Sequence, residues 1–128
     1  MNHKSALVQI AKISPQLKTA YDAELEYWHP ESPSLTTLAG TLATAVSLNL
    51  ADLSDATLAD IFAICETALN NGEMDEANAI ATGFLEGLQH ADSRGDFNFA
   101  QVVHYLGQAS TAHCKAMDRF HGTSTRGL

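Results

Sequence analysis

The sequence is poor in lysine and arginine, and residues 19–93 contain neither. The same stretch carries thirteen of the fifteen carboxylates, and the net charge is -8. A chain of this charge is unsuited to direct binding of a nucleic-acid backbone or an anionic membrane, and it favours a basic protein as partner. The thirteen carboxylates are Asp22, Glu24, Glu26, Glu31, Asp52, Asp55, Asp60, Glu66, Glu73, Asp75, Glu76, Glu86 and Asp92.

The sequence also has few cysteines, and its start lacks the uninterrupted apolar run of a secretory signal. The two cysteines, Cys65 and Cys114, are too few for a disulfide framework. Each falls within an apolar helical pattern, so we expect buried, reduced thiols. Lys4 and Lys12 interrupt the apolar residues near the start of the sequence, which is unlike a secretory signal. These features favour a cytoplasmic protein.

No stretch is apolar enough to suggest a membrane span. Residues 32–51 contain no charge, but serine, threonine and asparagine recur through them. A hydrocarbon core would not accept so many polar groups, so this segment predicts a helix that is buried in the protein or covered by a partner.

Apolar residues recur at helical spacing almost throughout, and no strand pattern competes. The sequence therefore predicts an all-α fold, a compact bundle of about five to six helices without a sheet. We expect one domain over residues 1–122 and a flexible C-terminal tail over 123–128. Expected helices are a short one around Leu7 to Ala11, one from Pro15 to Trp28, one following Ser34, one following Ser54 and ending at Asn71–Gly72, one from Met74 to His90, and one long helix from Phe99 to Phe120.

Three small residues on the fifth expected helix, Ala79, Gly83 and Gly87, lie four positions apart. Glycine inside a helix costs about 1 kcal/mol relative to alanine, so this row needs a compensating contact. We expect a neighbouring helix backbone to approach closely along it. A partner or dimer contact on the same row is the alternative.

Catalytic and metal-binding patterns are weak. Glu86 and His90 are four residues apart, and His104, His113 and His121 follow at irregular intervals, which departs from the paired Glu-x-x-His of di-iron bundles. Cys114 adjoins His113, and adjacent helical residues do not face each other. We therefore expect no enzyme activity, no catalytic residues, no metal and no cofactor.

A partial resemblance covers the C-terminal half, from Asp60 onward. Its residues are the run from Gly83 to Leu88, then Leu106-Gly107-Gln108, and then Cys114, Asp118, Arg119 and Phe120. In these positions the chain resembles a family of small, acidic, all-helical bacterial proteins of unknown function, some of which occur in toxin-immunity settings. The resemblance implies a helical fold and points towards an immunity role.

The leading hypothesis is therefore a bacterial immunity-type protein that neutralises a basic toxin or effector, such as a nuclease, by stoichiometric occlusion. A metal-dependent helical-bundle enzyme using Glu86, His90 and one further histidine is the alternative, and a phage-type inhibitor that mimics nucleic acid is another. The acidic surface also has a plain explanation, which is solubility. A homodimer is left open. The candidate partner-binding residues are Glu24, Glu26, Trp28 and Glu31 in one cluster and Asp60, Glu66, Glu73, Asp75 and Glu76 in a second.

Overall fold

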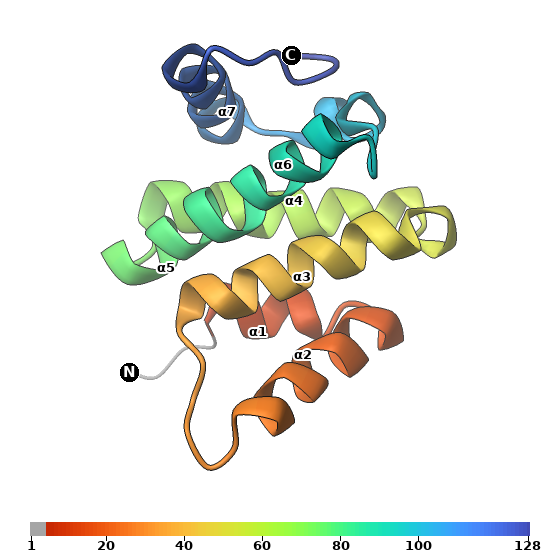
Figure 1. Ribbon diagram of the computed structural model, residues 1–128, viewed down its shortest axis with the longest axis vertical. Coiled ribbons are helices and arrows are strands. Elements are labelled where there is room, and N and C mark those ends of the chain that lie inside the picture. The colour runs from red at the N-terminus through yellow and green to blue at the C-terminus, as the bar shows by residue number, and fades with distance from the viewer. Residues whose placement is uncertain (1–4) are drawn as a thin grey trace.

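The computed structural model describes residues 5–128, and the predicted all-α fold is confirmed for them: these residues form helices and turns without a strand (Figure 1). Lys4 and the predicted start of the domain lie outside the described residues. The helices are α1 (Ala6–Ala11), α2 (Pro15–Trp28), α3 (Leu35–Asn49), α4 (Asp55–Asn71), α5 (Met74–Asn78), α6 (Glu86–Arg94) and α7 (Gln108–His121). A π-helical segment, η2 (Ala79–Leu85), joins α5 to α6 in one continuous helix.

Serine side chains begin four of these helices. Ser5, Ser14, Ser34 and Ser54 each accept a hydrogen bond from the backbone N–H three residues further on. Such caps satisfy N–H groups that have no partner within the helix. The predicted helix starts at Pro15, after Ser34 and after Ser54 are confirmed, and these caps fix where α2, α3 and α4 begin.

The centre of the molecule is the crossing of α3 with η2. A β-carbon added at Gly83 would lie 2.6 Å from the Cβ of Ala39 and 2.7 Å from the backbone oxygen of Thr36. One added at Gly87 would lie 3.1 Å from the Cβ of Ala43. The close approach of a neighbouring helix is thus confirmed. The alternative, a dimer contact on this row, is wrong because α3 covers the row.

The long last helix expected from Phe99 to Phe120 is wrong. Two short 3-10 turns, η3 (Phe99–Gln101) and η4 (Val103–Tyr105), precede α7 instead. Gly107 is extended, and the carboxylate of Glu66 accepts hydrogen bonds from the backbone N–H groups of Ala109 and Ser110. A carboxylate at this position stabilises a helix start, so α7 begins at Gln108.

The C-terminal tail over residues 123–128, predicted to be flexible, is held by specific contacts. Thr125 is buried and hydrogen-bonds to Asp118 through both its backbone N–H and its hydroxyl. Arg126 forms an ion pair of 2.8 Å with Asp92, whose side chain is 4% exposed. A buried carboxylate needs such partners, and the tail supplies them. The sequence pattern did not reveal the ion pair because Arg126 and Asp92 lie 34 positions apart.

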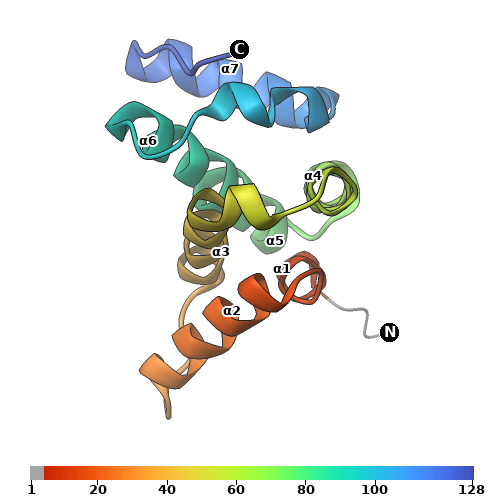
Figure 2. The same cartoon turned by 90° about the vertical axis from the view of Figure 1, so that its right-hand side faces the viewer.

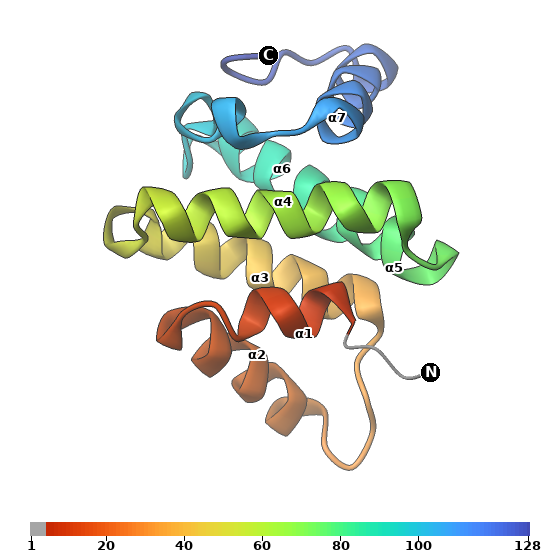
Figure 3. The same ribbon diagram turned by 180° about the vertical axis from the view of Figure 1, so that it is seen from behind.

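The helices are arranged along one long axis. α2 and the loop after it lie at one end, and α7 with the C-terminal tail lies at the other (Figures 1 and 2). Seen from behind, α4 runs across the middle with α1 beside it (Figure 3). Within the described residues no helix is both long enough and apolar enough to cross a membrane.

Candidate functional site

The C-terminal end of α2 projects large apolar side chains into solvent. Among its fourteen residues only Leu17 is fully buried. Tyr27 is 81% exposed, Trp28 is 39% exposed and Leu25 is 38% exposed. The rings of Tyr27 and Trp28 meet edge to face, with centroids 6.1 Å apart. Exposed aromatic groups that lie together on a surface are typical of protein interaction sites.

Carboxylates surround these aromatic groups. Glu26 and Glu31 are exposed, and Glu24 is half-buried. We use "the α2 tip" for Glu24, Leu25, Glu26, Tyr27, Trp28 and Glu31. The first predicted cluster therefore lies on the last turns of α2 and in the turn that follows, close in sequence to the exposed aromatic side chains.

Glu24 differs from the other tip carboxylates because two side chains hold it in place. Its Oε2 accepts a hydrogen bond of 2.8 Å from Trp28 Nε1, and its Oε1 accepts one of 3.1 Å from Thr41 Oγ1. Thr41 belongs to α3, so this contact also ties the tip to the body of the protein. A carboxylate fixed in this way loses less conformational entropy when it pairs with a cation.

Most of the described lysines and arginines lie far from the α2 tip. Arg94, Lys115, Arg119 and Arg126 belong to α6, α7 and the tail. The α2 tip lies at the opposite end of the long axis (Figure 2). Carboxylates accompany the distant cations, since Arg94 pairs with Asp96 and Arg126 with Asp92. On α2 itself Lys18 pairs with Asp22 at 2.6 Å.

The second predicted cluster is divided among different surfaces. Glu66 faces α7, where it accepts hydrogen bonds from two backbone N–H groups and from the hydroxyl of Ser110 at 2.8 Å. Partial burial by itself raises the pKa of Glu66, but these hydrogen bonds outweigh burial and lower it. The prediction of Glu66 as a partner contact conflicts with this role, because its carboxylate already serves as the cap of α7.

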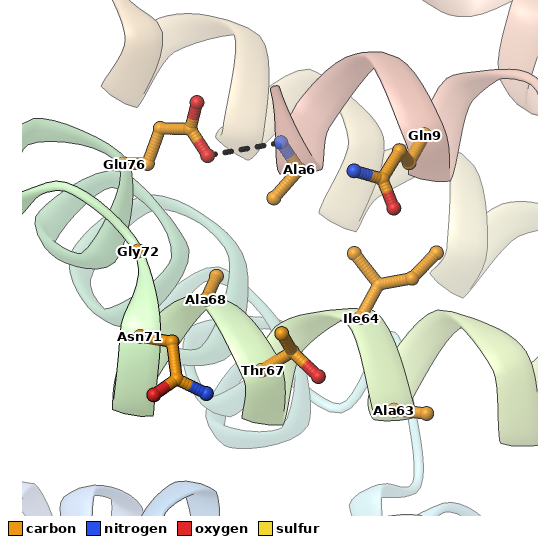
Figure 4. A pocket seen from close by; sticks show the side chains of 9 residues that line it. All are labelled: Ala6, Gln9, Ala63, Ile64, Thr67, Ala68, Asn71, Gly72 and Glu76. Atoms are coloured by element: carbon orange, nitrogen blue, oxygen red, sulfur yellow. Dashed lines mark hydrogen bonds between the residues drawn. The ribbon is translucent and has the colours of Figure 1, made fainter. Parts of the chain in front are cut away.

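Glu76 also has a structural role. Its Oε1 accepts a hydrogen bond of 3.0 Å from the backbone N–H of Ala6, the first residue of α1 (Figure 4). A cavity of about 280 Å³ lies beside this contact, between α1 and α4, with Gln9 and Ile64 on its facing walls. Of the remaining members of the second cluster, Asp60, Glu73 and Asp75 are exposed. They lie on α4 and at the start of α5.

Glu86 and the histidines of α6 and α7 lie near one another. Glu86 Oε2 lies 2.9 Å from His113 Nε2, so α6 and α7 are joined here by a hydrogen bond. His90 and His121 line a cavity of about 220 Å³ together with Glu86. Even so, no group of three or more histidine, cysteine, aspartate or glutamate side chains in residues 5–128 is arranged to hold a metal ion.

Both cysteines are buried and free, as the sequence predicts. Burial raises the pKa of the Cys65 thiol above its ordinary value and raises that of Cys114 to about 12. Burial has this effect because it disfavours the charged thiolate. Since the thiolate is the nucleophile, the arrangement disfavours nucleophilic catalysis by either cysteine.

Sequence reasoning missed three parts of the tip: Leu25, Tyr27 and Thr41. Leu25 is apolar and could belong to a buried helix face, yet its side chain is 38% exposed. Tyr27 follows Glu24 and Glu26, and an aromatic residue among acidic ones in the sequence could have indicated that Tyr27 is exposed. Nothing in the sequence indicated that Thr41 would bind Glu24.

Comparison with known proteins identifies the family. The chain belongs to the family described as a domain of unknown function (DUF7674), whose profile matches residues 8–122. The match spans α1 to α7 and ends at the glycine after α7. Searches of curated proteins and of solved structures returned no match.

Proposed function

We propose that the protein binds a basic protein partner through the α2 tip and thereby neutralises it, in the manner of a bacterial immunity protein. The observation that carries this proposal is the exposure of Tyr27, Trp28 and Leu25 among carboxylates. Isolated exposed apolar residues need no explanation, but here three lie on one helix end.

The tip combines the two features that protein recognition uses. Tyrosine and tryptophan contribute most often to binding hot spots because they bury much area at a low entropic cost. The surrounding carboxylates attract a cationic surface over a distance and accelerate association. Together they favour a protein over a small molecule, since the tip protrudes and small-molecule sites are concave.

If the tip covers the cationic substrate site of the partner, binding neutralises the partner. A nuclease or similar effector carries such a site because its substrate is anionic. One protein molecule would then block one effector molecule. The metal-enzyme alternative gains no supporting arrangement from residues 5–128.

Capture from the native host tests the proposal. Tagged protein is compared with Tyr27→Ser, and the control is Phe120→Ser, because Phe120 is 78% exposed but lies on α7. We expect a basic protein that is retained by the wild type and by Phe120→Ser and is lost with Tyr27→Ser. Equal retention by all three would contradict binding through the tip.

Salt and charge provide the second test with the captured protein. Glu26→Lys combined with Glu31→Lys should slow association at low ionic strength, and the difference should shrink as salt screens the charges. Asp60→Lys combined with Asp75→Lys, at two exposed residues away from the tip, makes the same change in net charge and is the matched control; it should change the rate less. If the tip substitutions leave the association rate unchanged, electrostatic attraction by the tip is not part of the binding.

A further inference from the structure

The α2 tip continues into a groove between α2 and α3. The groove has a volume of about 370 Å³. Its apolar walls include Ala20, Ala45 and Leu48, and Leu48 is 77% exposed. Glu24, Thr41, Thr44 and Asn49 contribute its polar side. The groove is thus a small surface depression, partly apolar and partly polar, with a single carboxylate in its lining.

The geometry points to an arginine side chain of the basic partner as the occupant of this groove. This inference rests on the proposed function, since it identifies which partner group the site recognises. Charge complementarity selects a cation: Glu24 is the only charged residue that lines the groove, and the neighbouring helix α3 carries no charge over Leu35–Asn49.

The shape and the hydrogen bonds of the groove favour arginine over lysine. A long aliphatic stem can lie along the alanines and Leu48, as amphipathic side chains do on apolar surfaces. Glu24 presents both carboxylate oxygens in an orientation fixed by Trp28 and Thr41. Guanidinium has a planar fork of donors that matches two fixed oxygens, whereas ammonium is a point charge.

Trp28 does not line the groove, but it orients the carboxylate that does. Its indole N–H donates to Oε2 of Glu24 at 2.8 Å. The aromatic side chain of the α2 tip therefore helps to fix the carboxylate that the partner's cation would meet.

A peptide titration tests this directly. The probe is a blocked Gly-Arg-Gly peptide, and the matched control replaces arginine with citrulline, which is similar in shape but uncharged. Isotope-labelled protein reports through the indole N–H of Trp28 and the backbone N–H of Ala45 and Leu48. We expect weak, saturable shifts of these signals with the arginine peptide, smaller shifts with a lysine peptide, and none with citrulline.

Substitution of Glu24 sharpens the test. Glu24→Gln should weaken binding of the arginine peptide about fivefold, the effect of removing one charge from a partly exposed ion pair. Asp60→Asn, at an exposed residue of α4 outside both the tip and the groove, should leave binding unchanged. Equal shifts with citrulline, equal affinity of Glu24→Gln, or an absence of shifts in the groove would each overturn the inference.

Failure here and failure of the proposed function are distinguishable. If the captured partner depends on Tyr27 but binds Glu24→Gln as tightly as wild type, the arginine site is wrong and the α2 tip still stands. If the arginine peptide binds the groove but partner capture ignores Tyr27, the groove recognises arginine and the proposed function is wrong.

Discussion

The crossing of α3 with η2 allows one stability prediction to be worked out in detail. Gly83→Ala adds a methyl group 2.6 Å from the Cβ of Ala39 and 2.7 Å from the backbone oxygen of Thr36. Non-bonded carbon atoms are most stable at about 3.5–4.0 Å, so α3 and η2 must separate by roughly 1 Å. No side-chain rotation relieves the contact, because one atom belongs to the backbone and the other is a β-carbon.

The expected size of the effect follows from two opposing contributions. Overpacking costs about 1–3 kcal/mol, and the backbone contact favours the upper part of that range. Replacing glycine by alanine in a helix returns about 1 kcal/mol. We therefore expect Gly83→Ala to lower the free energy of unfolding by about 2 kcal/mol.

Gly40→Ala is the matched control on the opposite side of the same crossing. Its added carbon would lie 3.9 Å from the backbone oxygen of Gly83, an ordinary contact distance. This variant should gain up to about 1 kcal/mol from helix propensity. Urea unfolding followed by circular dichroism measures both variants. Equal stability of the two would refute the reasoning that Gly83 is required by close helix packing.

Three further predictions concern other contacts. Arg126→Ala should destabilise the protein by about 1.5–3 kcal/mol, because it removes the charged partner of buried Asp92; chemical denaturation measures this, and an unchanged midpoint would show that the tail contributes nothing. The hydrogen bonds lower the folded-state pKa of Glu66, so its contribution to stability is present at neutral pH and is lost as the pH falls below about 4. In unfolding experiments from pH 7 to pH 3, Glu66→Gln should lose less stability on acidification than the wild type. Identical dependence of stability on pH in the two proteins would contradict this role of Glu66. Cys65 and Cys114 should react with a thiol reagent only when the protein unfolds, and rapid labelling of the native protein would contradict their burial.

Local signals predicted most of the helices. Ser14, Ser34 and Ser54 mark helix starts by a mechanism that acts within three residues, so the sequence reveals it directly. The row around Gly83 could be interpreted for a similar reason, since glycine in a helix needs a compensating contact. These predictions depend only on contacts between residues close in sequence, or on the free-energy cost of a single glycine within a helix.

Long-range contacts account for the predictions that were wrong. Glu66 begins α7 from a position more than forty residues earlier, and Arg126 binds Asp92 from the far end of the chain. Helical periodicity contains no information about such partners. It extended the last helix back to Phe99, and polar composition made the tail look free of contacts.

The members of the candidate site differ in what the sequence could indicate. Charge and aromatic content selected Glu24, Glu26 and Trp28, which lie on the last turns of α2, and Glu31, which lies in the turn after it. The second cluster was selected by charge alone, and the structure directs Glu66 towards α7 and Glu76 towards α1. The sequence gives the sign of each charge, but only the folded structure shows which neighbouring element each side chain faces. Reversal of charge at Glu76 should consequently disturb α1 as well as the surface.

Hydrogen exchange on the protein with and without its captured partner examines the α2 tip most directly. Slower exchange of backbone N–H groups is expected in residues 20–31 and along the facing part of α3, with little change in α7. The same pattern should weaken with Tyr27→Ser. Protection confined to α7, to the tail or to the exposed side of α4 would contradict recognition of a basic partner by the α2 tip.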